Sequence, residues 1–309
     1  MLNLSDYNDK KVRVFLHDGS TFEGYSTHNS VEYSFSEFGV DSECLQICDY
    51  LIREEEIERI ELIEALPSVR STEEELAMIF SVRRSFSEHL KRWEDNELPD
   101  QYDLNCFEYS AQPSQEEFER ALDLQRERGD TFIKLVGDVP LADDFGLSSG
   151  VRLTMQLSGG TECRNVNDKV EIKTPRYKDL KETALKHFGP VRGEDFAARN
   201  ADHLYEYLGC RGAYLGEKLV GAYYFYTSGG YTCVDGLIVD QDFRRRHIAA
   251  ALLKHASEEA AGNVVFLHAD QDSVAKKVFE KLGFREVGRR YEYLSAEIGS
   301  LTAKRKPSG

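Results

Sequence analysis

Residues 237–253 bring together the residue types that could hold an anion. An apolar stretch ends before Arg244, Arg245 and Arg246, and small side chains at Ala249 and Ala250 follow near the start of an expected helix. A helix start exposes unpaired N–H groups and the positive end of the helix dipole, and small side chains let a ligand approach that backbone. The segment therefore predicts a cradle for a phosphate or pyrophosphate. The alternative is a solvated basic turn, as found on many protein surfaces.

The elements around this segment can be read from hydrophobic periodicity and from glycine and proline positions. Helices are expected at 176–188, ended by Gly189-Pro190, and at 193–208. Strands follow at 212–215, 219–226 and 231–239, then a helix at 246–261, a strand at 264–268, a helix at 273–282 and a strand at 287–294. The expected order is α-α-β-β-β-α-β-α-β, which places the basic turn between a strand and a helix.

Two motifs in this half resemble the GNAT superfamily of N-acetyltransferases. Arg244-x-x-His247-Ile248-Ala249 is similar to the family's [R/Q]-x-x-G-x-[G/A] acyl-CoA loop. Downstream, Asp272-Ser273-Val274-Ala275 and then Phe279-x-x-x-Gly283-Phe284 are similar to N-x-x-A followed by Y-x-x-x-G-F. The resemblance covers residues 161–296 and implies an α/β (α+β) GNAT fold with a mixed, mostly antiparallel sheet.

The resemblance implies that acetyl-CoA is the cosubstrate, with no metal, and that an amine attacks it directly. The pyrophosphate would lie on the backbone that begins the helix, and the pantetheine arm would pair with the preceding strand. The residues implied in cofactor binding are Ile238, Val239, Arg244, Arg245, Arg246, His247, Ile248, Ala249, Ala250, Asp272 and Phe279.

Three positions depart from the family pattern. His247 stands where glycine is usual, so its side chain must point away from the phosphates. Asp272 replaces asparagine, and its alternative role is to cap a helix. Phe279 replaces a tyrosine that often protonates the leaving thiolate, which phenylalanine cannot do. A thiolate of reference pKa ~8.5 can still leave without full protonation.

The catalytic residues are less clear from the sequence. Asp235 is the candidate general base, because it lies two residues beyond Cys233, where some relatives carry a glutamate on the same strand face. Tyr291 is the candidate acid in place of Phe279. The alternatives are a structural carboxylate and an aromatic side chain that only packs.

Residues 1–66 resemble an Sm-like or SH3-like small β-barrel. Val12, Val14 and Leu16 alternate with other residues, and Asp18-Gly19 marks a tight turn. Residues 54–64 are compatible with a helix or with a short helical turn and a closing strand. Such a module would provide protein contacts, including contacts between copies of the chain.

Residues 67–160 are expected to be α/β structure, either as a degenerate GNAT-like half or as one wall of the acceptor site. A helix is expected from Leu76 toward Trp93, and Ser114 and Glu117 form a capping box that opens another helix ended by Gly129. The segment has no basic turn before a helix, so no second cofactor is expected there. Residues 297–309 are expected to be a flexible basic tail.

Charge is unevenly distributed along the 309 residues. The chain has 39 Lys and Arg against 55 Asp and Glu, a net charge of −16. Residues 1–66 contribute 5 basic and 15 acidic side chains, residues 67–160 contribute 10 and 19, and residues 161–309 contribute 24 and 21. The acidic front argues against nucleic acid and anionic membranes, and favours a cationic acceptor.

These features predict an acyl-CoA-dependent N-acetyltransferase. The alternative is a non-catalytic acyl-CoA-binding regulatory or scaffold protein with a GNAT fold. Because no secretory stretch and no C-x-x-C pair is seen, a cytoplasmic location with reduced thiols is expected.

Overall fold

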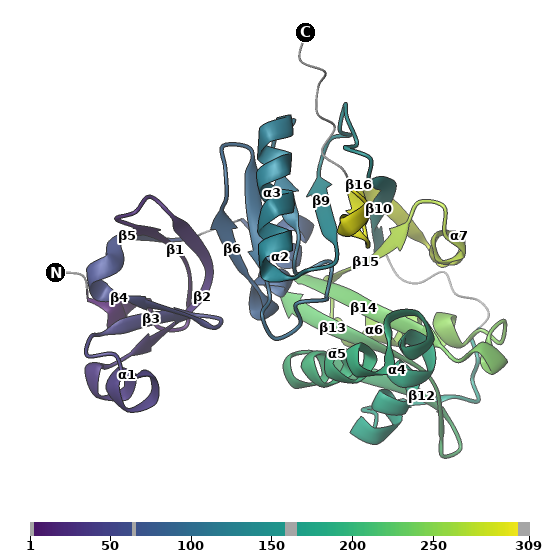
Figure 1. The fold of residues 1–309 in the computed structure, drawn as a ribbon. Coiled ribbons are helices and arrows are strands. Elements are labelled where there is room, and N and C mark those ends of the chain that lie inside the picture. Colours follow the sequence, from purple (N-terminus) through teal and green to yellow (C-terminus); the bar gives the residue numbers. More distant parts are fainter. Residues whose placement is uncertain (1–2, 64–65, 158–165, 302–309) are drawn as a thin grey trace, which may run out of the picture. The chain divides into compact units, whose positions relative to one another are not determined.

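A computed structural model describes residues 3–63, 66–157 and 166–301, which divide into two units (Figure 1). The first unit contains residues 1–65, 76–150 and 290–309, and the second contains residues 66–75 and 151–289. Helix α2 (Val69–Phe80) and strands β10 (Ser148–Leu157) and β16 (Phe284–Ser295) each contribute to both units. No described helix is long and apolar enough to cross a membrane.

The second unit is a mixed sheet with helices. Its strand order is β11-β12-β13-β14-β15-β10. The strands are β11 (Glu171–Lys173), β12 (Gly209–Leu215), β13 (Lys218–Ser228), β14 (Tyr231–Val239) and β15 (Val264–Asp270). Neighbours are antiparallel except β14 and β15, which run parallel because α6 (Ile248–Glu259) connects them. The expected α/β class with a mixed sheet is confirmed.

One face of this sheet holds the main core of the second unit. Ile248, Leu252 and Leu253 of α6 are buried with Val234 and Leu267 of the parallel strands. Helix α7 (Val274–Lys281) adds the buried Phe279 to the same cluster. Burying this face fixes the start of α6 and one side of α7 beside the end of β14.

The two helices before β12 differ slightly from expectation. Helix α5 (Glu194–Tyr207) has the predicted extent, but α4 continues from Tyr177 through Gly189-Pro190 to Arg192. Pro190 lies in the last turn, where it removes few helical hydrogen bonds, and Gly193 with φ of 93° ends the helix. Proline was therefore the wrong signal for the helix end.

The first unit begins with an antiparallel β module. Its elements are η1 (Leu4–Tyr7), β1 (Lys10–Leu16), β2 (Thr21–Asn29), α1 (Val31–Phe38), β3 (Cys44–Ile47), β4 (Tyr50–Arg53), η2 (Glu54–Glu56) and β5 (Ile57–Leu62). The strands pair in the order β5-β1-β2-β3-β4. Residues 54–62 therefore form a short 3-10 turn and then a strand, the second of the two expected forms. The Sm-like interpretation stays a prediction.

The rest of the first unit is an antiparallel group of strands that leads into a strand–helix–strand unit. Strands β6 (Val82–Ser85), β7 (Leu90–Glu94) and β8 (Phe107–Tyr109) are antiparallel, and β9 (Ile133–Gly137) runs parallel to β8 after α3 (Gln115–Arg128). The helix expected toward Trp93 is wrong beyond Phe80, because the chain turns into the β6–β7 hairpin. The degenerate-half interpretation stays a prediction.

The end of the described chain packs against the first unit. Ile298 is buried, its N–H donates to the Thr131 carbonyl, and the Leu301 carbonyl accepts from Arg126. The expected flexible tail therefore does not begin at residue 297. Residues 302–309 lie outside the described part of the chain.

Candidate active site

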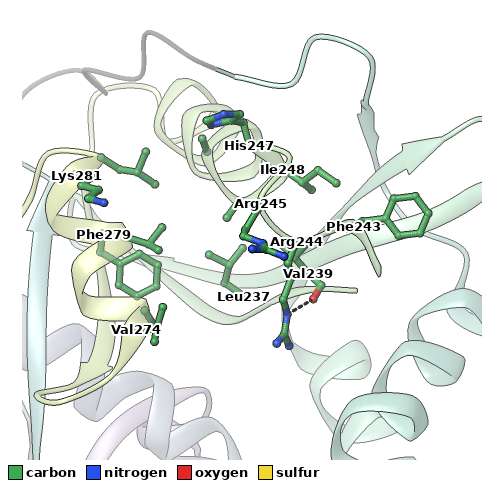
Figure 2. A pocket seen from close by; sticks show the side chains of 15 residues that line it. Leu237, Val239, Phe243, Arg244, Arg245, His247, Ile248, Val274, Phe279 and Lys281 are labelled. Atoms are coloured by element: carbon green, nitrogen blue, oxygen red, sulfur yellow. Dashed lines mark hydrogen bonds between the residues drawn. The ribbon is translucent and has the colours of Figure 1, made fainter. Parts of the chain in front are cut away.

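A pocket of about 790 Å³ lies between the end of β14, the start of α6 and α7 (Figure 2). Arginine side chains and the helix start meet an apolar wall there. The lining residues are Leu237, Val239, Phe243, Arg244, Arg245, His247, Ile248, Ala249, Ala250, Val274, Ala275, Val278, Phe279, Lys281 and Leu282. Most residues of the predicted cofactor set are among them, whereas Ile238, Arg246 and Asp272 are not.

The start of α6 offers three backbone donors to this pocket. The first intrahelical bond runs from the Ala251 N–H to the His247 carbonyl at 3.1 Å. In the described part of the chain no acceptor is recorded for the N–H groups of Ile248, Ala249 and Ala250, and the His247 side chain does not cap the helix. Unpaired N–H groups at a helix start are suited to bind an anion.

The backbone of the loop before α6 accounts for the glycine that the GNAT pattern has where this chain has His247. His247 has φ of 57°, and Arg245 has φ of 61°, both in the left-handed region. Glycine adopts this conformation without a Cβ clash, whereas other residues incur a cost of about 1 kcal/mol or more. His247 is exposed, and its backbone takes the required turn although it carries a side chain.

The three arginines have different environments. Arg244 and Arg245 line the pocket, and Arg244 Nε donates to the Val239 carbonyl at 3.3 Å. Arg246 instead places its guanidinium 5.0 Å from the Phe243 ring centroid, outside the pocket lining. Two exposed cations therefore reach the region of the unpaired N–H groups.

Strands β14 and β15 separate beside the pocket. They pair from Tyr231↔Val264 to Val234↔Leu267, and β14 then continues without a β15 partner. A bulge at Gly236, with φ of 57°, lies where Tyr223 faces two residues of β14. Glycine inside a strand is a sequence signal for such a bulge, and Gly236 could have located this one.

Beyond the bulge, some backbone N–H and C=O groups of β14 face the side on which β15 no longer pairs with it. The Asp240 N–H donates to the Val220 carbonyl at 2.9 Å, so the peptide groups of Ile238, two residues earlier, also face β13. The Leu237 carbonyl and the Val239 N–H consequently face the gap left by β15. Val239, and not Ile238, therefore directs its N–H to the gap.

Helix α7 contributes Phe279 and not Asp272. Phe279 is buried at the pocket wall, with its ring centroid 6.0 Å from that of Phe284. The cap of α7 is Ser273, whose Oγ accepts from the Lys276 N–H at 3.1 Å. Asp272 is exposed and neither lines the pocket nor caps the helix.

The two predicted catalytic residues fall in different units. Asp235 lies on β14 opposite Tyr224, at the start of the gap. Burial, together with Cys210 and Asp235, raises the pKa of Tyr224 well above its ordinary value. Tyr291 pairs with Gly137 of β9 and packs against the core of the first unit. The structure therefore does not bring Tyr291 into the pocket lining.

A polar group missed by the sequence analysis lies near Asp235. His268 Nε2 is 2.7 Å from Glu73 Oε1, which also accepts from Thr154 Oγ1 at 2.9 Å. Burial raises the pKa of the Cys233 thiol well above its ordinary value. The nearby Asp235 and Glu73 carboxylates raise it as well. Glu73 and His268 are 195 positions apart in the chain, so no local pattern could have paired them.

Helix α3 provides an internal comparison for α6. Its N-terminus carries a capping box in which Ser114 N–H donates to Glu117 Oε2 at 2.8 Å and Glu117 N–H donates to Ser114 Oγ at 3.2 Å. Strand β8 is paired with β9 through all three of its residues, and the Tyr109 ring covers Gly137. The helix start is occupied by the protein's own carboxylate, and no gap opens beside it.

Residues 177–293 match a family model described as an acetyltransferase (GNAT) domain. The chain has no significant match among curated proteins. A conserved protein of unknown function from Staphylococcus epidermidis is 16% identical, covers 69% of this chain and 93% of its own, and has a TM-score of 0.58.

Two further solved structures are similar over most of their length. A putative GNAT acetyltransferase from Novosphingobium aromaticivorans is 20% identical with a TM-score of 0.44, covering 68% of this chain and 88% of its own. A GCN5-related N-acetyltransferase from Kribbella flavida is 14% identical with a TM-score of 0.49, covering 74% and 94%. The Staphylococcus structure shows a shared fold. Residues 177–293 are similar to a GNAT acetyltransferase domain.

Proposed function

We propose that the protein is an acyl-CoA-dependent N-acetyltransferase that transfers an acetyl group from acetyl-CoA directly to an amine. The observation that supports this most strongly is the set of three N–H groups at Ile248, Ala249 and Ala250, which have no acceptor among the described residues and open onto a pocket beside Arg244 and Arg245. A pyrophosphate supplies the charge and the acceptor oxygens that such a site lacks.

The remaining parts of acetyl-CoA match other features of the pocket. The Leu237 carbonyl and the Val239 N–H, which face the gap beside β14, can pair with the amides of the pantetheine arm. The apolar wall of Val274, Val278 and Phe279 suits the methylene and sulfur portion. Arg246 and Asp272, which do not line the pocket, are at most peripheral contacts in this proposal.

The reaction requires an amine without its proton. An alkylamine of reference pKa ~10.4 is mostly protonated at neutral pH, so a proton acceptor near the gap accelerates attack on the thioester. Asp235 remains a candidate for this role. Tyr291, which does not line the pocket, remains the candidate acid, and its role depends on whether acetyl transfer requires it. The acidic front of the chain favours a cationic amine by electrostatic steering.

A second candidate function is favoured by Phe279. It lines the pocket where the resembling family often has a proton-donating tyrosine. A protein that binds acetyl-CoA without transferring its acetyl group, and so acts as a regulator or scaffold, is the alternative.

Calorimetric titration with acetyl-CoA, together with thiol release over a panel of amines, polyamines and peptide N-termini, tests the proposal. Wild type should bind, and Arg244→Glu/Arg245→Glu should bind much more weakly. Arg192→Glu, a charge reversal on α4 outside the pocket lining, is the matched control and should bind like wild type. Absence of binding at high micromolar acetyl-CoA would refute the cofactor assignment, and binding without transfer to any amine would favour the second candidate.

A further inference from the structure

The polar group around His268 lies on the face of the sheet opposite the pocket. Val234 and Leu267 point into the core beneath α6 and α7. Because side chains alternate along a strand, Asp235 and His268, the next residue on each strand, point to the other face. Val234↔Leu267 is the last recorded pair of β14 and β15, so both polar side chains lie where the strands begin to separate.

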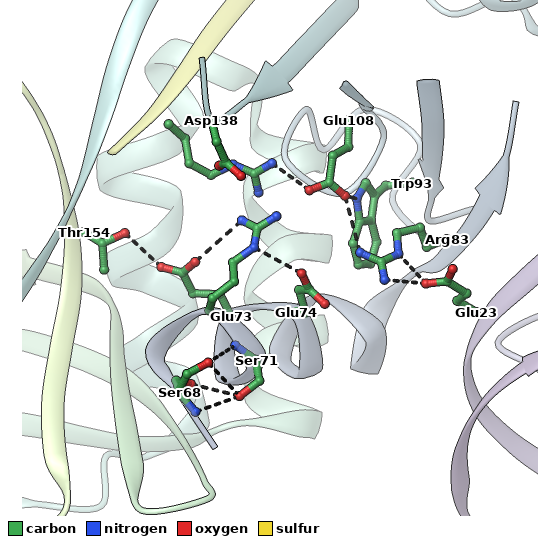
Figure 3. Close-up of polar contacts among 12 residues, drawn as sticks. Glu23, Ser68, Ser71, Glu73, Glu74, Arg83, Trp93, Glu108, Asp138 and Thr154 are labelled. Carbon is green, nitrogen blue, oxygen red and sulfur yellow. Dashed lines mark hydrogen bonds and ion pairs between the residues drawn. The ribbon is translucent and has the colours of Figure 1, made fainter. Parts of the chain in front are cut away.

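Contacts on two other elements orient His268. Its Nε2 is 2.7 Å from Glu73 Oε1 on α2, and Thr154 Oγ1 of β10 donates to the same oxygen at 2.9 Å (Figure 3 shows the Glu73–Thr154 contact). The Glu73 side chain is 14% exposed and that of His268 is 26% exposed. A carboxylate that accepts from Nε2 fixes the tautomer in which Nδ1 carries the lone pair. Across the described ranges no hydrogen bond to Nδ1 is recorded.

Other charged groups near this position are accounted for. Arg70 lies 3.8 Å from Glu73 and 3.1 Å from Glu74, both on α2. The charges that act on the neighbouring Cys233 thiol are Asp235, Glu73 and Arg152. Burial opposes ionisation of Glu73, but hydrogen bonds from His268 and Thr154 hold its pKa below the ordinary value, so it is a carboxylate at neutral pH.

We propose that His268 accepts the proton of the acceptor amine and that Glu73 is its positioning residue. The inference rests on the proposed function and deepens it. An acceptor in its ammonium form transfers one proton to His268 Nδ1. The lone pair that this frees on the amine nitrogen then forms the bond to the thioester carbon. The C–S bond breaks, the nitrogen releases its second proton to solvent, and the CoA sulfur leaves as the thiolate or, after taking up a proton from solvent, as the thiol.

His268 fits this role better than Asp235. Proton transfer is most efficient when the basicity of the acceptor matches the operating pH, and an imidazole is closer to neutrality than a carboxylate. Glu73 stabilises the imidazolium that forms, whereas no hydrogen bond or ion pair within the described residues orients the Asp235 carboxylate. Because Glu73 precedes residues 177–293, the second unit would draw part of its catalytic group from outside the matched domain.

The test compares two pairs of variants in the full chain. His268→Gln is matched with His255→Gln on α6, and Glu73→Gln with Glu74→Gln one residue further along α2. Thiol release is measured with acetyl-CoA and the amine panel between about pH 5.5 and 9, and acetyl-CoA affinity by calorimetry. Loss of general-base catalysis should lower kcat of His268→Gln about 100-fold or more at neutral pH without changing acetyl-CoA affinity.

Glu73→Gln gives the second readout. Removing the anionic partner destabilises the imidazolium, so the acidic limb of the pH–rate profile should move to lower pH, while Glu74→Gln leaves the limb in place. A merely structural contact would not move this limb. Glu73→Gln can also retain a hydrogen bond through its amide oxygen, so it tests the inference even if His268→Gln does not fold.

The outcomes separate the inference from the proposed function. Wild-type rate and pH profile in His268→Gln, or equal profiles in Glu73→Gln and Glu74→Gln, would overturn the inference and leave the acetyltransferase proposal standing. Wild type that binds acetyl-CoA but transfers to no amine would overturn the inference, since no proton acceptor is then used. Wild type that does not bind acetyl-CoA would refute the proposed function, and the inference with it.

Discussion

Replacing Ala249 with aspartate should strengthen the fold while weakening cofactor binding. Ala249 is the second residue of α6, is half-buried and lines the pocket. A carboxylate in the first turn of a helix is favoured by the helix dipole by about 0.3–1 kcal/mol. The same carboxylate meets the N–H groups that the proposal assigns to a pyrophosphate. Fold stability and binding are therefore expected to change in opposite directions.

The size of the binding loss follows from Coulomb's law. Two unit charges about 5 Å apart repel by about 0.8 kcal/mol in water and by about 3 kcal/mol at an effective dielectric constant of 20. A pyrophosphate carries at least two charges, and Arg244 and Arg245 are exposed, so the value in water is appropriate. Two such repulsions give a loss of about 1.7 kcal/mol, which corresponds to about 15-fold weaker binding.

Calorimetric titration with acetyl-CoA at low and high salt, together with thermal unfolding, measures both effects. Ala249→Asn is the control, because it has nearly the same shape without the charge. Aspartate should weaken binding more than asparagine, and salt should reduce the difference between them. Wild-type affinity in Ala249→Asp, or equal losses in both variants, would refute an electrostatic cradle at the start of α6.

Three further predictions concern the gap, the pocket wall and the internal comparison helix. Phe279→Tyr supplies the missing proton donor, so kcat in thiol release should rise about tenfold or more at unchanged acetyl-CoA affinity; an unchanged kcat would show that protonation of the leaving thiolate is not limiting. Gly236→Ala forces a side chain into the left-handed bulge 3.1 Å from Tyr224, and should reduce the free energy of unfolding in urea by about 1–2 kcal/mol, whereas Gly150→Ala, with no atom within 4 Å, should change it little. Glu117 has a pKa of about 2, because hydrogen bonds from Ser87, Ser114 and His89 outweigh burial. Its carboxylate therefore stabilises the fold by at most about 3 kcal/mol above pH 4.5, and this falls by about half by pH 3, since the unfolded chain takes up the proton first. Urea unfolding of Glu117→Gln at pH 7 and pH 3 should show the larger deficit at pH 7, and equal deficits would contradict the assigned hydrogen bonds.

The loop and helix start that line the pocket could be predicted from the sequence because their signal is local. A strand, a basic turn and a helix of small residues occupy consecutive positions, and the structure places Arg244, His247 and Ala249 around one pocket. The same local logic identified the capping box at Ser114 and Glu117. It did not show that position 247 requires a left-handed backbone, which is a property of the folded loop.

Features that depend on distant segments were not predicted. Gly236 becomes a bulge only because β13 pairs on one side while β15 departs on the other. The contact between Glu73 and His268 needs α2 to lie over β10 and β15 within the second unit. Periodicity also extended the helix beyond Phe80, where a hairpin buries Leu90 and Trp93 as strand residues.

The position of the cofactor is the central claim, and a crystal structure of the full chain with acetyl-CoA tests it most directly. The account predicts pyrophosphate oxygens within hydrogen-bond distance of the N–H groups of Ile248, Ala249 and Ala250, and the pantetheine arm along Leu237 and Val239 in the gap beside β15. Acetyl-CoA bound elsewhere on the chain, with those three N–H groups still unpaired, would contradict it.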